Sequence, residues 1–182
     1  QPLFYFKNNM GKSCLNKLTG NIVQDCAITQ NGIKNVYLMY PEDVTFTFGA
    51  GFEYVDSVTF VGSAKSYLIE GYKQNIQLTT SARAMDASMR LDYSLTFKIP
   101  LRSTWHIRAF STGKFYAMAE FLAGYSILVG ATCPLECSAM DGDSNANSGM
   151  FTITLTAPEG SAGNYPVEVL AAAKNTIISK SV

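Results

Sequence analysis

Regular alternation of apolar and polar residues is the feature of this sequence that most constrains its fold. From Leu91 to Ile99, every second side chain is apolar or aromatic, and Asp, Ser, Thr or Lys stands between. Successive side chains of a strand point to opposite faces, so this pattern predicts a strand with one buried face. Residues 76–82 and 151–155 alternate in the same way. Shorter β-favouring segments predict further strands at 33–40, 45–48, 52–55, 55–61, 66–72, 115–121, 125–129 and 135–139.

One helix is predicted, over residues 101–112, directly after the strand that ends at Pro100. Gly113 suits the position just past its end. Residues on one helical stripe recur at spacings of four, four and three, and Trp105 is the largest of them. We therefore expect Trp105 to anchor the helix to the sheet. The stripe consists of Leu101, Trp105, Ala109 and Thr112.

Composition predicts association between copies of the chain. The 182 residues have a net charge of zero, and only 15% of them are charged. A surface with so few charges is poorly protected against association, so copies or partners are expected to cover part of it. The same balance excludes the basic footprint of a nucleic-acid-binding domain. No apolar run approaches the length of about 18 residues that suggests a membrane span, and the start does not resemble a signal peptide.

A long hairpin is the element best placed for such contacts. If the strands at 76–82 and 91–99 pair, they leave an eight-residue tip, residues 83–90, which is too long for a tight turn. Arginine can pair with carboxylates of a neighbouring subunit, and methionine can adapt to an irregular surface. The alternative is a surface loop without a partner. The candidate contact residues are Arg83, Met85, Asp86, Met89 and Arg90.

The residues that could support catalysis or bind a metal form no complete motif. His106 is the only histidine, and it lies in the predicted helix without an acidic neighbour, so an enzyme is not expected. No cofactor-binding motif is present. The four cysteines are interpreted as reduced thiols, with zinc as the alternative, although Cys14, Cys26, Cys133 and Cys137 do not form two Cys-x-x-Cys pairs.

Residues 141–147 resemble the start of a calcium loop. Oxygen-bearing side chains occur at every second position, as Asp141, Asp143, Asn145 and Asn147. Ala146 stands where the loop needs glycine and Thr152 where it needs glutamate. A turn between strands is therefore favoured over a calcium site, and no metal is predicted.

The order of several motifs along the chain resembles a tail tube protein of bacteriophages that infect gut Bacteroides-type bacteria. These motifs are Asp25-Cys26, residues 31–38 (Asn-Gly-Ile-Lys-Asn-Val-Tyr-Leu), Glu42-Asp43-Val44, the long hairpin, the helix, and the Gly-Asp-Ser-Asn loop before residues 151–157. The resemblance covers about residues 14–159. The lead 1–9 and the tail after Glu159 depart from it, which leaves open a specialised tail component instead of the main tube subunit.

The resemblance implies a mainly β fold: a β-sandwich or partial barrel of antiparallel strands with a single flanking helix, a long hairpin and terminal arms. Residues 1–30 would form an N-terminal arm, 31–160 the tube domain and 161–182 a C-terminal tail. Hexameric rings of the chain would stack into a conduit for the genome, in contact with other tail proteins and with passing DNA that is not bound specifically. The protein would be assembled in the bacterial cytoplasm and would reside in the virion tail, without a membrane.

A second class of function stays open at this point. Aromatic-rich β-sandwiches often present ligand-binding loops at a virion or cell surface. Here residues 46–54 or 141–149 would be such loops.

Overall fold

A computed structural model describes residues 32–71, 75–85, 88–100, 104–142, 149–158 and 165–182. The predicted mainly β class is confirmed, and the arrangement is consistent with a sandwich. In chain order the elements are β1 (Ile33–Met39), β2 (Val44–Phe48), the short 3₁₀ turn η1 (Ala50–Phe52), β3 (Tyr54–Phe60), β4 (Tyr67–Glu70), β5 (Ile76–Met85), β6 (Ser88–Pro100), α1 (Thr104–Thr112), β7 (Lys114–Phe121), β8 (Ser126–Val129), β9 (Leu135–Gly142), β10 (Met150–Thr156), β11 (Val167–Val169) and α2 (Ala171–Ser179).

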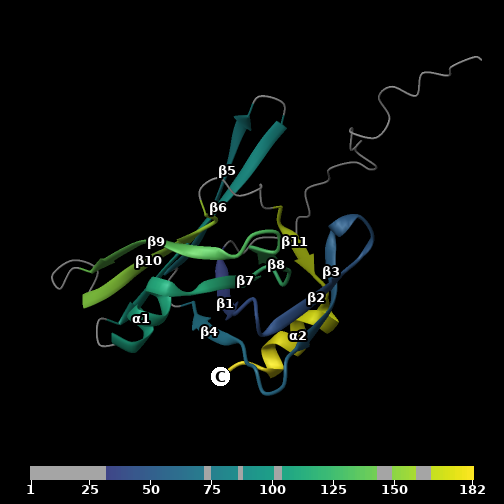
Figure 1. The fold of residues 1–182 in the computed structure, drawn as a ribbon, viewed down its shortest axis with the longest axis horizontal. Coiled ribbons are helices and arrows are strands. Elements are labelled where there is room, and N and C mark those ends of the chain that lie inside the picture. Colours follow the sequence, from purple (N-terminus) through teal and green to yellow (C-terminus); the bar gives the residue numbers. More distant parts are fainter. Residues whose placement is uncertain (1–31, 72–74, 86–87, 101–103, 143–148, 159–164) are drawn as a thin grey trace, which may run out of the picture.

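The strands form two sheets that are joined where β7 pairs with β9. We call the order β2-β3-β11-β8-β7-β1-β4 the major sheet and the order β9-β10-β6-β5 the minor sheet. They meet where Lys114 and Phe115, the first residues of β7, pair with Glu136 and Leu135 of β9. Figure 1 shows the β5–β6 hairpin rising from the body of the molecule, with α2 on the opposite side. Most pairs are antiparallel, but β11 runs parallel to β3.

The principal core contains residues of both sheets. The alternation that predicted strand 91–99 is confirmed, because Tyr93, Leu95, Phe97 and Ile99 are buried. They share one cluster with inward residues of the major sheet and of α1. That cluster consists of Ile33, Val36, Leu38, Ile76, Tyr93, Leu95, Phe97, Ile99, Phe110, Phe115, Ala117, Ala119, Val129, Leu135, Ile153 and Leu155.

A second core lies on the other face of the major sheet, beneath α2. It includes Tyr37, Met39 and Met118 of the central strands and Ala173 and Ile177 of the helix. Because both faces of β1 and β7 are covered, four consecutive residues are buried in each strand, over 36–39 and 117–120. A strand covered on both faces does not need alternating polarity, so burial replaces alternation here.

The C-terminal residues 165–182 are part of this fold. The sequence predicted one helix, but the described residues contain two, and α2 belongs to the segment expected to be a tail. Leu170 N donates to Val55 O at 3.2 Å, and Ser66 Oγ donates to Ile177 O at 2.7 Å. These bonds attach the segment to β3 and to the approach of β4.

The predicted hairpin around Gly49-Ala50-Gly51 is confirmed, since β2 and β3 pair from Val44–Phe60 to Phe48–Val55. Gly51 has a φ of 75°, in the left-handed region that glycine adopts without strain. The separate strands expected at 52–55 and 55–61 are one strand, β3.

Candidate assembly surfaces

The long hairpin forms as predicted, but its tip does not. Pairing between β5 and β6 continues to Arg83–Arg90, Ala84–Met89 and Met85–Ser88. The strands therefore extend through most of the expected eight-residue loop, and only residues 86 and 87 separate them. The expectation of a long loop was wrong because the ladder continues past the last clearly alternating residue, Ala82.

This register places the predicted contact residues at the far end of a two-stranded arm. Arg83 and Arg90 occupy directly opposed positions, Met89 lies one step further and Met85 two steps further, and Asp86 falls outside the described residues. Like charges at opposed positions of a hairpin are destabilising unless something compensates them. Asp92, opposite Ser81, occupies the next position along the same face of the hairpin.

Trp105 does not anchor α1. Its side chain is 72% exposed, whereas Phe110 of the same helix is buried. The rings of Phe97 and Phe115 lie 5.3 and 5.4 Å from that of Phe110. The predicted helix phase was therefore wrong: the stripe through Trp105 and Thr112 faces outward. Phe110 is the residue that packs α1 against the core between the sheets.

The outer face of the minor sheet is rich in hydroxyl groups. Residues of β6 and β10 that alternate with the buried ones carry mainly Ser and Thr, and Thr96 Oγ1 lies 3.3 Å from Thr154 Oγ1. Ser138 Oγ of β9 donates to Thr154 O at 3.2 Å. The face also carries Lys98, its register continues to Arg83 and Arg90 at the end of the arm, and Lys114 Nζ of β7 lies 2.9 Å from Glu136 Oε1. The set comprises Gln77, Thr79 and Ser81 of β5, Asp92, Ser94, Thr96 and Lys98 of β6, Thr152, Thr154 and Thr156 of β10, and Glu136, Ala139 and Asp141 of β9, with Ser138 at the register shift of β9.

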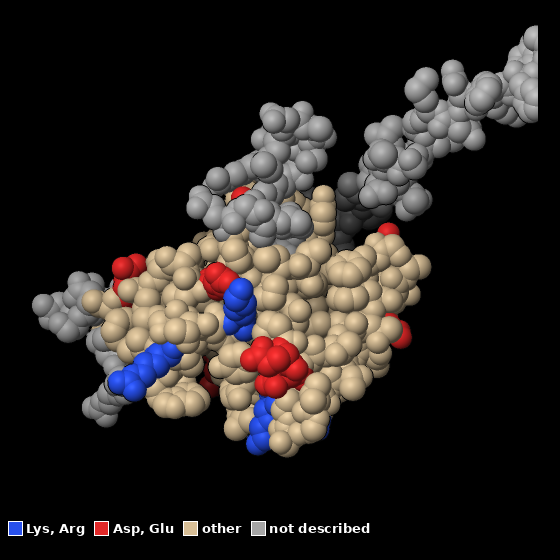
Figure 2. All heavy atoms as spheres, in the orientation of Figure 1, with Lys and Arg blue, Asp and Glu red and all other residues tan. Residues whose placement is uncertain are grey.

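Sparse charge is visible on the surface itself. Figure 2 shows a few separate groups of Lys and Arg or Asp and Glu on a face that is otherwise uncharged. The exposed large apolar residues in the described part of the chain include Phe52, Leu68 and Trp105. Such a surface fits the expectation from composition that copies or partners cover part of it.

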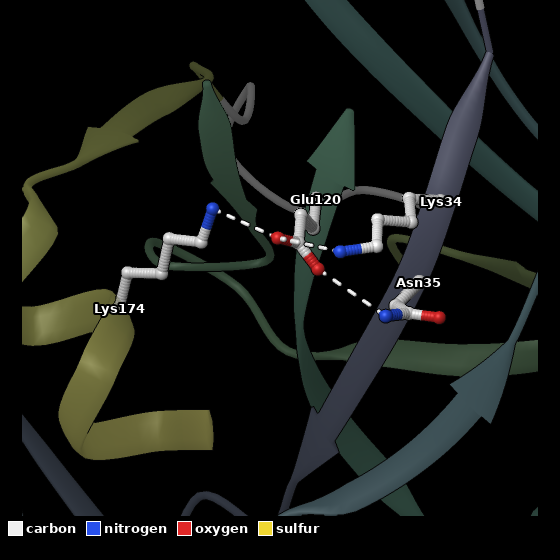
Figure 3. Close-up of polar contacts among 4 residues, drawn as sticks. All are labelled: Lys34, Asn35, Glu120 and Lys174. Atoms are coloured by element: carbon white, nitrogen blue, oxygen red, sulfur yellow. Dashed lines mark hydrogen bonds and ion pairs between the residues drawn. The ribbon is translucent and has the colours of Figure 1, made fainter. Parts of the chain in front are cut away.

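One buried carboxylate lies beneath α2 (Figure 3). Glu120 of β7 is 7% exposed, and Lys174 Nζ of α2 lies 2.8 Å from its Oε1. Asn35 Nδ2 of β1 donates to its Oε2 at 3.2 Å, and Lys34 Nζ lies 3.8 Å from Oε1. Burial acts to raise the pKa of Glu120, but the hydrogen bond and charge of Lys174, then Lys34 and Asn35, lower it overall.

This cluster has a structural role. A buried charge is costly unless it is paired and hydrogen-bonded, and Glu120 is both. Its partners come from β1 and α2, so it links the C-terminal helix to the centre of the major sheet. Sequence reasoning missed Glu120, although a single acidic residue within the apolar run of 115–121 was a usable signal.

The candidates for catalysis and metal binding are not brought together where they are described. His106 is exposed on α1 beside the ring of Trp105, at 5.8 Å. Neither Cys133 nor Cys137 is in a disulfide, and burial raises the pKa of Cys137, which disfavours its nucleophilic thiolate. Within the described ranges, no group of three His, Cys, Asp or Glu residues could hold a metal ion.

The remaining members of these predicted sets lie outside the described residues. They are Cys14, Cys26 and residues 143–148 of the calcium-like loop. Neither helix in the described part of the chain is long and apolar enough to cross a membrane.

No family model matches the sequence, and neither a curated protein nor a solved structure matches it. The function is therefore inferred from the surfaces of the described residues.

Proposed function

We propose that this chain is a self-assembling structural subunit, and specifically a phage tail tube subunit whose stacked hexameric rings form a conduit for genome ejection. The observation that carries the proposal is the β5–β6 hairpin. It extends beyond the core as a paired arm, and the residues of β5 from Gln77 to Ala82 are exposed or only partly covered. A free subunit gains little from such an arm, whereas an assembly can use it for contacts between copies.

The outer face of the minor sheet supports a conduit. Its hydroxyl groups keep the face hydrated, and its acidic residues are Asp92, Glu136 and Asp141, of which Glu136 is paired with Lys114 at 2.9 Å. Binding of DNA requires clustered Lys or Arg that neutralise phosphates. Between the arm and β9, the basic residues on this face do not cluster, so a polyanion can pass over its hydroxyl groups without being retained.

The projecting arm supports contact between subunits. Arg83 and Arg90 stand opposite each other at its end, where acidic residues of a neighbouring copy can pair with them. Assembly in the bacterial cytoplasm and residence in the virion tail follow from this proposal, together with contacts to other tail proteins.

Electron microscopy of the purified chain tests this proposal. Rings with a central hole, or tubes made of stacked rings, are expected. Separate monomers at every concentration would contradict it.

A ligand-binding module is the second candidate, because the exposed ring of Phe52 at the turn of the β2–β3 hairpin continues a row of aromatic rings that packs against the second core. The ring of Phe46 lies 5.3 Å from that of Tyr116 and 6.2 Å from that of Phe48, and Phe48 stacks on Phe52 at 3.9 Å. Aromatic faces of this kind can stack on sugar rings. Binding of the monomeric chain to a glycan array, abolished by Phe52→Ala, would favour this candidate over the tube.

A further inference from the structure

The hydrogen-bonded path through the strands has two ends. Among the described strands, β2 pairs only with β3, and β5 pairs only with β6. Each end strand therefore directs a row of backbone N–H and C=O groups away from the sheet. Such a row is a template for pairing with another chain.

Neither end strand contains a proline, and charged residues are absent from β2 and from the part of β5 before Arg83. β2 reads Val-Thr-Phe-Thr-Phe. Two other edges differ: β4 ends on Glu70, and the part of β9 beyond its pairing with β7 carries Asp141. Because proteins usually block exposed edges, two unblocked ends indicate that both are covered in the working protein.

The β2–β3 hairpin carries a second, independent sign of an interface. Phe52 has a φ of 64°, in the left-handed region that is costly for a residue with a Cβ, and its side chain is 43% exposed. Strained residues of this kind cluster at functional sites. Phe52 stacks on Phe48, the last residue of β2, so the strained residue lies against the end of that strand.

The free edge of β2 can be assigned to particular residues. Val61 N donates to Asp43 O at 2.9 Å, and these two residues continue the register of β2 with β3. Because N–H groups alternate in direction along an antiparallel strand, the N–H groups of Val44 and Phe46 point to the free edge.

We propose that β5 of one copy pairs with β2 of the next copy, so that the sheet continues head to tail from subunit to subunit. The inference rests on the proposed function and adds the two edges that join neighbours. The occupant of each edge is a second copy because the two ends of one sheet path offer complementary backbone groups on uncharged, β-favouring strands. Since the two edges differ, the interface is heterologous, which is the kind that closes into a ring.

Proline substitutions that block one edge at a time test this pairing. On β2, Phe46→Pro removes an outward N–H, and Phe46→Ala is the control that loses the ring but keeps the N–H. On β5, Thr79→Pro and Thr80→Pro are both made, because adjacent residues direct their N–H groups to opposite edges. We use the β5 proline variant that matches the unmodified chain in circular dichroism and thermal unfolding. Its control carries alanine at the same position.

The expected result separates this pairing from the other arrangements. Each proline variant alone should sediment as a monomer, whereas both alanine controls should assemble. An equimolar mixture of the two proline variants should form a dimer and nothing larger, because one intact β5 meets one intact β2.

Several results would overturn the pairing and leave the proposed function standing. In the first, both proline variants assemble as the unmodified chain does. In the second, the β2 variant forms dimers with itself. In the third, the mixture of the two proline variants stays monomeric. Failure of the unmodified chain to form rings would instead contradict the proposed function.

Cysteine cross-linking keeps the pairing testable if a proline variant does not fold. Thr45→Cys is combined in turn with Thr79→Cys, Thr80→Cys and Ser81→Cys, and the assembled chain is oxidised. A ladder of linked chains longer than a dimer is expected for at least one combination and for none of the four single variants. Its absence from all three combinations in assembled protein would overturn the pairing.

Discussion

The major and minor sheets differ in how they are covered. In the major sheet, the minor sheet covers one face and α2 the other, so Met118 and its neighbours in β7 are buried throughout. In the minor sheet, one face carries Ser and Thr, and β5 extends past the core. Burial of apolar area is the main favourable term in folding. Both sheets therefore stabilise the subunit through the core between them, and the outer face of the minor sheet is free to serve contacts outside it.

Substitutions in α1 test where the core between the sheets ends. Phe110→Ala removes a buried ring that contacts Phe97 and Phe115, and it should lower the free energy of unfolding by about 3–5 kcal/mol. Trp105→Ala, its matched control on the same helix, should change it by less than about 1 kcal/mol. Denaturant unfolding of monomers measures both values. Equal losses would mean that α1 covers the core with a different face.

A pair of strand substitutions tests the comparison of the two sheets directly. Met118→Ala opens a cavity in the second core and should cost about 2–5 kcal/mol. Thr154→Ala, on the hydroxyl face of the minor sheet, removes one partly exposed contact to Thr96 and should cost less than about 1 kcal/mol. If the two substitutions lower the free energy of unfolding equally, the outer face of the minor sheet is as important for folding as the face of the major sheet beneath α2.

Glu120→Gln should lower the free energy of unfolding at neutral pH by about 1.5–3 kcal/mol, because it removes a charged acceptor from Lys174. The contribution of Lys34 is small, since its side chain is 57% exposed. Glu70→Gln on the exposed end of β4 is the control and should leave stability unchanged within about 0.5 kcal/mol.

The same carboxylate predicts a dependence on pH. The pKa of Glu120 is lower in the folded than in the unfolded chain, so its contribution is present above the unfolded pKa and is lost as pH falls through the folded pKa. Urea unfolding of monomers between pH 7 and pH 3 should show a smaller acid loss in Glu120→Gln than in the unmodified chain. Parallel curves for the two proteins would show that the ion pair contributes nothing.

Shortening the hairpin should have the smallest effect on folding. Ala82 and Leu91 are paired in the register, so Asn-Gly can replace residues 83–90 and close the strands with a two-residue turn. The free energy of unfolding should change by less than about 1 kcal/mol, because the removed pairs lie beyond the core. A larger loss in thermal unfolding would show that the arm supports the subunit itself.

Sequence patterns predicted those parts of the fold that have one covered face. The alternation of Leu91–Ile99 identified β6, and the glycines of 49–51 identified the β2–β3 hairpin. β11 and α2 were missed because they are short and gain their stability by packing on the major sheet. The orientation of α1 was missed because two aromatic residues, Trp105 and Phe110, compete for the core, and only the tertiary structure decides between them.

The candidate surfaces were predicted in part. The hairpin and its residues were found from alternation and length, but the extension of its ladder to Met85 and Ser88 was not, because Arg and Met do not alternate clearly with polar residues there. The free edges of β2 and β5 depend on strand order, which links residues far apart in the sequence. No local pattern contains that information.

Sedimentation of the unmodified chain beside the hairpin-shortened variant, at micromolar concentrations, tests the central claim most directly. The account predicts particles of ring size or larger for the unmodified chain and monomers for the variant, with the same thermal unfolding for both monomeric subunits. An unmodified chain that remains monomeric at every concentration, or a variant that assembles equally well, would contradict it.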